Sequence, residues 1–386
     1  MNLPTNSIPI VEAQKDKNVS VNAIFKANWK RFVLSHSSEL RLVEIDEVTK
    51  MLSCKGPDRG CFVYLCTSCD EYHFMYFGCN SRICSLCGKR HTDNWAEQLS
   101  KNTFDVPHKH FTMTLPDILW EPIREDRGAL KVLMDSAILT IKEFYEDIFG
   151  KDLTPGCIVV LHQFGRDLKY NPHIHVLATK GGFDAKKRFL EWTQFVPYKK
   201  LHKKWMAIVC KNLKAYFSST DEFTQLFRIV WALYRETGFV VDVCKRIIKN
   251  KKELAKYIAR YVRHPAIANS RIVEFDDKVV HFFYKSHKTH QRIDVRMQID
   301  EFISAIIQHI PEKQFKTIRY YGAYCRNQKK KYKSFFKSSI QQTKISSFSS
   351  LRQVLCPKCS KPMVFIWYTK KKPPPEMLTL LDFIVV

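Results

Sequence analysis

The sequence lacks the two features that mark membrane-bound and secreted proteins. None of its apolar runs approaches the length that a bilayer-spanning segment needs. Its N-terminus has no charged stretch followed by an apolar one, which is the pattern of a secretory signal. We therefore expect a cytoplasmic protein that has no membrane partner.

Acidic residues are also scarce. The 38 Asp and Glu residues stand against 63 Lys and Arg residues, which leaves a net charge of +25. Such an excess favours a polyanionic partner, and with a membrane set aside we expect nucleic acid. The 27 Phe, 16 Tyr and 7 Trp residues include side chains that could stack on bases, although most must form the core. A chain of 386 residues is long enough for two or three domains.

The 13 cysteines do not fit a secreted disulfide scaffold, because the chain is large and spaces several of them in CxxC pairs. Cys66 and Cys69 form one pair and Cys84 and Cys87 another, with fourteen residues between the pairs. This spacer is one residue short of the usual range for two knuckles that share a zinc ion. We predict a structural zinc site built from these four thiolates. Five further residues remain as alternative or additional ligands: Cys54, Cys61, Cys79, His73 and His91. Cys356 and Cys359 form half of a zinc site, without an obvious second half.

Residues 159–182 predict a hairpin of two strands. An apolar run ends in His162, turn-forming residues follow, and a second extended run begins at His173 and stops at two glycines. Because strand side chains alternate between faces, His173 and His175 share one face, and folding the hairpin places His162 beside them. Neutral imidazole is the commonest metal ligand. We therefore predict a divalent-cation site formed by His162, His173 and His175.

Apolar periodicity places further regular elements around this hairpin. It predicts two helices within residues 21–53, a strand at 109–115, a long helix at 129–149 and a basic helix within 192–217. A helix is also predicted at 246–264, and on it Tyr257 and Tyr261 lie one turn apart on the same face. Two tyrosines at this spacing are, in an anonymous helix, more often part of a core than of an active site.

The histidine pattern resembles the signature of the HUH single-strand DNA endonucleases, in which two histidines flank a hydrophobic residue on a central strand. Three segments together resemble the rolling-circle insertion-sequence transposases of the tyrosine HUH class. They are the predicted strand at 109–115, the hairpin segment from His162 through His173-Ile-His175 to the two glycines, and the helix that carries Tyr257 and Tyr261. The cysteine segment resembles the N-terminal zinc-binding module of the same proteins. The resemblance covers most of residues 50–325.

The resemblance implies an α+β fold, with an HUH-type antiparallel sheet and flanking helices behind a small zinc-binding module. It implies a DNA transposase that nicks and transfers single-stranded DNA through a 5′-phosphotyrosine, in the bacterial cytoplasm at the nucleoid. Tyr257 and Tyr261 carry over as nucleophiles, with Mg²⁺ or Mn²⁺ at the histidine site and Zn²⁺ at the cysteine site. Basic residues near the motifs are the candidate DNA contacts: Arg82, Arg90, Arg166, Lys256, Arg260, Arg263 and Arg271.

We expect four segments along the chain: a helical segment at 1–53, the zinc-binding domain at 54–105, the HUH domain at 106–325, and a basic linker and tail at 326–386. Three alternatives stay open. A plasmid or phage replication initiator or relaxase would share the chemistry, a zinc-dependent DNA-binding protein would lack catalysis, and a metallohydrolase would activate water instead of a tyrosine. The sequence also leaves the oligomeric state open, a homo-oligomer included.

Overall fold

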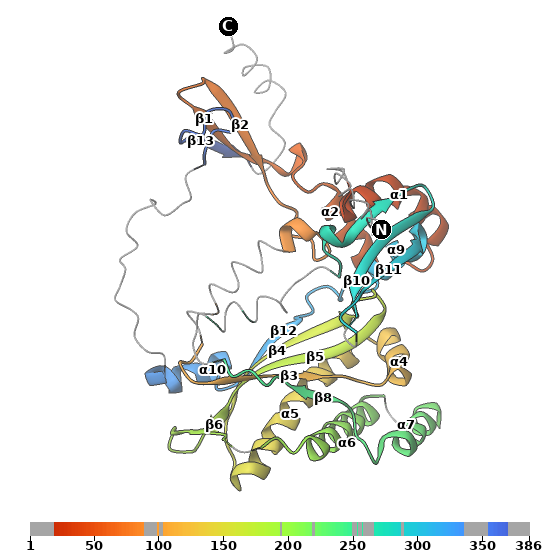
Figure 1. Ribbon diagram of the computed structural model, residues 1–386, viewed down its shortest axis with the longest axis vertical. Helices are drawn as coiled ribbons and strands as arrows, with labels where there is room; N and C mark the ends of the chain where they lie inside the picture. The colour runs from red at the N-terminus through yellow and green to blue at the C-terminus, as the bar shows by residue number, and fades with distance from the viewer. Residues whose placement is uncertain are drawn as a thin grey trace, which may run out of the picture.

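The computed structural model describes residues 19–88, 99, 103–193, 195–217, 221–248, 253, 257, 266–286, 289–335 and 354–369. Within them the chain forms helices and antiparallel sheets, so the expected α+β class is confirmed (Figure 1). None of the helices in these ranges combines the length and the apolar character that membrane crossing requires.

A five-stranded antiparallel sheet contains the predicted histidine hairpin. Its strands run in the order β12-β4-β5-β3-β8, and they are β3 His108–Met113, β4 Gly156–Phe164, β5 Tyr170–Thr179, β8 Val241–Val243 and β12 Ile318–Gly322. The hairpin is confirmed, because β4 pairs with β5 from Cys157 opposite Ala178 to His162 opposite His173. Its loop closes with a hydrogen bond from Gly165 N to Lys169 O of 2.9 Å. The predicted strand at 109–115 is β3, which pairs with β5.

Helices cover one face of this sheet (Figure 1). They are α4 Trp120–Glu125, α5 Ala129–Phe149, α6 Tyr198–Tyr216 and α7 Asp221–Tyr234. Alternate residues of the two central strands, among them Val159 and Val176, are fully buried beneath them. α5 matches the predicted helix, and it ends where Gly150 takes a left-handed backbone with φ 64°. Lys204 of the predicted basic helix lies 3.1 Å from Glu143 of α5, so part of that charge pairs within the protein.

The opposite face of the sheet carries the histidines. Strand alternation explains this arrangement, because Val159 and Leu161 on β4 point into the helix-covered core while His162 points the other way. On β5, Ile174 and Val176 face the helices and the two histidines face away. A smaller core that contains Tyr257 covers part of this second face. The sheet therefore brings all its candidate site residues to one side.

A second core joins the N-terminal helices to a later part of the chain. The predicted helices are confirmed as α1 Val21–His36 and α2 Leu42–Leu52. They share one core with α9 Ile299–Ile307 and with a second antiparallel sheet, which is formed by β9 Ile272–Phe275, β10 Val279–Lys285 and β11 Arg292–Gln298. α1 begins after Ser20, whose hydroxyl accepts a hydrogen bond of 3.1 Å from the Ala23 amide. Cys79, Cys84 and Cys87 belong to the same core, so the cysteine segment is anchored to these helices.

A third sheet combines strands from the two ends of the described chain. Its order is β13-β1-β2, with β1 Cys61–Cys66, β2 Glu71–Tyr76 and β13 Val364–Thr369. Figure 1 shows it at one end of the molecule, with the blue β13 beside the orange hairpin of β1 and β2. The remaining short elements are β6 Gly181–Phe183, β7 Phe189–Glu191, α10 Arg326–Lys329 and the 3-10 turns Pro57–Arg59, Asp117–Leu119, Asn269–Arg271 and Lys330–Phe335. The division into four segments stays a prediction.

Candidate functional site

The β4–β5 hairpin brings the three predicted histidines together. His162 lies directly opposite His173 on the neighbouring strand, and His175 is two residues further along β5 on the same face. One side-chain nitrogen of each residue lies within 4.8 Å of the others. The ring centroids of His162 and His175 are 4.5 Å apart, and those of His173 and His175 are 4.9 Å apart. Three imidazoles in this arrangement can bind one cation.

Hydrogen bonds orient two of these rings through Nδ1. His173 Nδ1 lies 2.8 Å from the carbonyl oxygen of Asn171. His175 Nδ1 lies 2.9 Å from Nε2 of His110 and 3.3 Å from Oγ1 of Thr112. Metal-binding histidines are oriented in this way, with one ring nitrogen held by a second residue. In both rings Nε2 is therefore the nitrogen offered to a cation.

His110 also connects the histidine site to Tyr257. The Tyr257 hydroxyl lies 2.9 Å from His110 Nδ1, on the opposite side of the ring from the contact with His175. The rings of His110 and His175 are nearly parallel, with an angle of 17° between their planes and centroids 5.1 Å apart. The exposed fractions of His110, Tyr257 and His175 are 6%, 7% and 8%. A buried row of two hydrogen bonds thus runs from the candidate nucleophile to a candidate metal ligand.

Burial keeps the imidazoles of His110 and His175 in the neutral form. Desolvation lowers the pKa of His110 to about 4. The pKa of His175 is lowered well below its usual value, first by burial and then by the charges of His162, His173 and His110. Neutral imidazole is the form that binds metal, so the electrostatics agree with the geometry.

Sequence reasoning misses His110. The available signal is its place in the strand pattern, two residues before Thr112 and on the face opposite Phe111 and Met113. That alternation puts His110 and Thr112 on the polar side of the strand. Their role becomes visible only when β3 lies beside β5, where Thr112 is opposite His175.

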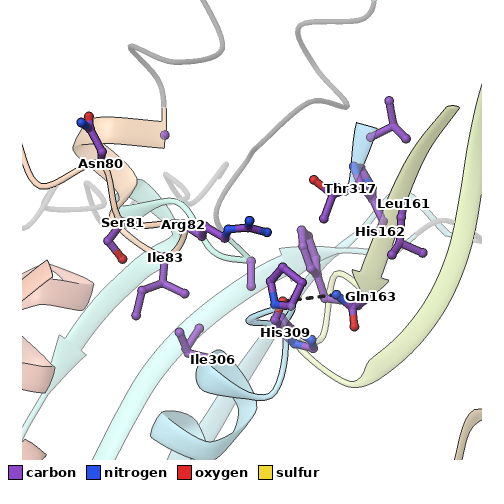
Figure 2. Close-up of a pocket in the computed structure, with 15 residues that line it drawn as sticks. Asn80, Ser81, Arg82, Ile83, Leu161, His162, Gln163, Ile306, His309 and Thr317 are labelled. Atoms are coloured by element: carbon purple, nitrogen blue, oxygen red, sulfur yellow. Dashed lines mark hydrogen bonds between the residues drawn. The ribbon is translucent and has the colours of Figure 1, made fainter. Parts of the chain in front are cut away.

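Arg82 reaches the histidine site from the cysteine-rich segment. A cavity of about 90 Å³ lies between them, and Arg82, His162 and His309 line it. Figure 2 shows the Arg82 side chain extending into this cavity. The guanidinium donates a hydrogen bond of 3.2 Å to the carbonyl oxygen of Phe315. It places positive charge in the cavity that His162 also lines, where a phosphate approaching the histidines would meet it.

Arg166 and Arg271 contact backbone carbonyls. Arg271 Nε donates to Phe283 O at 2.8 Å and a second guanidinium nitrogen donates to Arg166 O. Arg166 Nη1 donates to Lys285 O at 3.0 Å. These bonds fasten the loop of the histidine hairpin to β10. Their predicted contact with DNA stays a prediction. The other predicted site residues lie outside the described residues: Tyr261, Arg90, Lys256, Arg260 and Arg263.

The cysteines form two sets of four instead of the single predicted set. The first set is Cys54, Cys79, Cys84 and Cys87, and the second is Cys66, Cys69, Cys356 and Cys359. Within each set all Sγ atoms lie within 4.8 Å of one another. The prediction that the pairs Cys66/Cys69 and Cys84/Cys87 share one zinc ion is therefore wrong. Cys54 and Cys79, predicted as alternative ligands, belong to the first set.

The β1–β2 hairpin explains this correction. Cys66 ends β1 and Cys69 lies in the turn before β2, whereas Cys54 precedes β1 and Cys79 follows β2. Each strand has 6 residues, and a strand of that length extends about 17 Å. Thiolates at the turn cannot share an ion with thiolates at the open end, because zinc–sulfur bonds are about 2.3 Å long.

The first set fits a zinc ion. Its Sγ atoms are separated by 3.6 Å between Cys54 and Cys84, 3.7 Å between Cys54 and Cys87, and 3.7 Å between Cys79 and Cys87. A tetrahedron with zinc–sulfur bonds of about 2.3 Å has edges of about 3.8 Å, whereas a disulfide bond is only about 2.0 Å long. Contacts among these thiols raise the pKa of Cys79 and Cys84, and the hydrogen bonds from these two residues lower the pKa of Cys54. That shift favours the thiolate, which is the metal-binding form.

Comparison with known proteins agrees with this arrangement. Residues 156–331 match a family described as putative transposase, and residues 24–115 match one described as transposase zinc-binding domain. The first range holds the histidine hairpin and Tyr257, and the second holds the whole first cysteine set. The chain is therefore a transposase, and it acts on DNA. The zinc-binding match and the geometry of the first set together support Zn²⁺.

Two curated relatives define the type of transposase. The chain is 28% identical over 320 residues to the transposase for insertion sequence element IS801 of Pseudomonas savastanoi pv. phaseolicola, a match that covers 78% of this chain and 74% of that protein. It is 24% identical over 316 residues to a putative transposase of Sinorhizobium fredii, covering 78% of each. No solved structure matches the chain. The chain belongs to the IS91-like transposases and carries their N-terminal zinc-binding domain.

Proposed function

We propose that this transposase nicks and rejoins single-stranded DNA through a 5′-phosphotyrosine and so supports rolling-circle transposition at the bacterial nucleoid. The observation that carries the proposal is the buried row from Tyr257 through His110 to His175. It connects a nucleophile that can form an ester with phosphate to a cluster that can hold a cation. The match of residues 156–331 to a family described as putative transposase supports a reaction on DNA.

The histidine cluster fits a divalent cation such as Mg²⁺ or Mn²⁺. His162, His173 and His175 offer one nitrogen each, and the last two are oriented by partners at Nδ1. When bound, the cation would polarise the scissile phosphate and neutralise charge that develops on it. Arg82, at the edge of the same cavity, would hold a neighbouring phosphate of the strand.

The hydrogen-bond row gives His110 a defined role. If Nε2 of His175 is the ligand atom, its proton sits on Nδ1 and is donated to Nε2 of His110. The remaining proton of a neutral His110 is then on Nδ1 and is donated to the Tyr257 oxygen. A phenol has a pKa of about 10 and is a weak nucleophile at neutral pH. A donor aimed at its oxygen favours the phenolate and holds it in place.

The chemical step then balances on the side chains of this protein, the DNA and water. The Tyr257 hydroxyl gives its proton to water, the phenolate oxygen attacks the phosphorus and forms an ester with the phosphate of the 5′ end, and the bond from phosphorus to the 3′ oxygen breaks. The departing 3′ oxygen takes up a proton from water and becomes a hydroxyl. The ester keeps the energy of the broken bond, so a later 3′-hydroxyl can attack it and rejoin the strand without ATP. Tyr261, four residues on, would serve as a second nucleophile for strand transfer.

The test uses oligonucleotides of the element's ends, labelled at either end, with Mg²⁺ or Mn²⁺. We expect a protein-linked 5′ end that Tyr257→Phe abolishes, or that Tyr261→Phe abolishes if the second tyrosine cuts first. Tyr324→Phe is the matched control, because Tyr324 is also buried and also contacts a β3 histidine, with its hydroxyl 2.7 Å from His108 Nε2. That variant should retain the adduct.

Two outcomes would contradict the proposal. Cleavage without any protein-linked end would indicate water activation at the histidine site. If the wild type leaves correct end sequences uncut, the chain is a zinc-dependent DNA-binding protein. Where the wild type does cut, a His175→Ala variant tests the histidine site, because cleavage that depends on the cation is lost when this ligand is removed.

A further inference from the structure

The second cysteine set joins segments that are far apart in the sequence. Cys66 and Cys69 lie at the turn of the β1–β2 hairpin, and Cys356 and Cys359 come just before β13. The Sγ atoms of Cys66 and Cys359, 293 positions apart in the chain, are separated by 3.5 Å. That distance is close to the edge of a zinc tetrahedron, about 3.8 Å, and far from a disulfide bond.

The backbone of both cysteine pairs is shaped for a metal. In the second pair, Ser360 N donates to Cys356 O at 2.8 Å, which reproduces the 2.8 Å bond from Gly88 N to Cys84 O in the first set. Ser360 has φ 58°, and Asp70, directly after Cys69, has φ 52°. A non-glycine residue rarely adopts this left-handed backbone. The same unusual conformation thus follows the second cysteine of each pair.

Apolar burial does not explain why β13 stays on the sheet. The strand pairs with β1 from Val364 opposite Leu65 to Thr369 opposite Cys61, yet none of its six residues is buried. Phe365 and Tyr368 are 49% and 54% exposed. A small sheet without a buried side chain on its edge strand is marginal in water. Ligand bonds at the end of the strand would supply what side-chain burial does not.

We infer that Cys66, Cys69, Cys356 and Cys359 bind a second zinc ion. All four positions of a tetrahedral site are filled by cysteine, so the ion is structural and leaves no position for substrate. It ties β13 to the β1–β2 hairpin and closes a three-stranded zinc ribbon from the two ends of the described chain. Two of its ligands lie beyond residue 331, outside both ranges that match known families.

The experiment counts thiolate-bound metal in the full chain. Protein produced with Co²⁺ in place of zinc absorbs through sulfur-to-cobalt charge transfer, a signal that the histidine site cannot give because it has no thiolate. We expect the double variant Cys356→Ser/Cys359→Ser to lose about half of this absorption and about one equivalent of zinc by elemental analysis. The half-buried Cys210 belongs to neither set, so Cys210→Ser is the matched control and should lose nothing.

A second measurement guards against a folding defect. Only the first cysteine set belongs to the core with α1 and α9, so the double variant should keep the helical circular dichroism of the wild type. Trypsin should cut the variant near Lys358 and Lys361 much faster than the wild type, because the segment 354–369 has lost its attachment. The inference is overturned if the double variant keeps the full cobalt absorption, or if its segment resists trypsin as well as that of the wild type.

Discussion

Replacing His110 tests whether the hydrogen-bond row positions the nucleophile. His110→Ala removes the group 2.9 Å from the Tyr257 hydroxyl and the partner of His175 Nδ1. A hydrogen bond to a charged group contributes about 1.5–3 kcal/mol. Each 1.4 kcal/mol is about a factor of ten in rate. We therefore expect protein–DNA adduct formation to slow by about ten- to a hundredfold.

His110→Asn should recover most of that loss. The Asn amide nitrogen can occupy the place of Nδ1 and donate to the Tyr257 oxygen, although it does not reach His175. His108→Asn is the matched control, because His108 lies on the same strand and face and contacts the Tyr324 hydroxyl at 2.7 Å. Burial lowers the pKa of His108, like that of His110, to about 4. Both substitutions therefore remove a buried imidazole that contacts a tyrosine hydroxyl, but only His110 contacts the candidate nucleophile and His175.

The assay is single-turnover adduct formation on a labelled single-stranded oligonucleotide, at saturating protein and Mn²⁺. A structural defect would slow the His108 and His110 variants alike and would give no advantage to Asn over Ala at position 110. The reasoning would be refuted if His110→Ala formed the adduct at the wild-type rate. It would also be refuted if His108→Asn slowed adduct formation as much as His110→Ala does.

Two further predictions concern stability and DNA binding. His108 and His110 have a pKa of about 4 in the fold against 6.5 unfolded, so the unfolded chain binds more protons between these pH values. Stability therefore falls as pH drops from 6.5 to 4, by about 3 kcal/mol for each residue. The urea unfolding midpoint should decrease over this window, and less steeply in His108→Gln; an equally steep decrease in the variant would contradict the low pKa of His108. Arg82→Ala should weaken binding of a single-stranded oligonucleotide and reduce the slope of log K against log salt concentration by about 0.7, the contribution of one phosphate contact. Fluorescence anisotropy measures both quantities. Arg188 pairs with Asp184, so Arg188→Ala is the control and should bind normally.

The histidine site is predictable from sequence because its geometry is local. Alternation fixes which face His173 and His175 occupy, and turn residues between two extended runs specify the hairpin that brings His162 opposite them. The same reasoning gives α5, whose apolar spacing and terminal Gly150 define its extent. These features depend on neighbours within about twenty residues.

The cysteine pairing fails because it is decided by contacts that spacing does not encode. Fourteen residues between two CxxC pairs look like a loop closing one zinc site, but they contain β2 and carry the chain away from Cys69. The pair Cys356 and Cys359 has no partner pair close by in the sequence, because Cys359 lies next to Cys66, 293 positions away. Likewise His110 becomes part of the site only through the pairing of β3 with β5. Nothing in a local pattern specifies such pairings.

The zinc-binding segment does more than precede the sheet that carries the histidines. The turn between Cys79 and Cys84 is fixed to α2, because Ser81 Oγ donates to Glu47 O at 2.8 Å and the Arg82 amide donates to the Glu47 carboxylate at 2.8 Å. That turn also forms one wall of the cavity beside His162 (Figure 2). The cysteines that bind the first zinc ion therefore also determine where the Arg82 guanidinium lies. Since a zinc site supplies folding energy to the turn it closes, zinc bound at the first cysteine set would stabilise the turn that carries Arg82 into the cavity beside the candidate site.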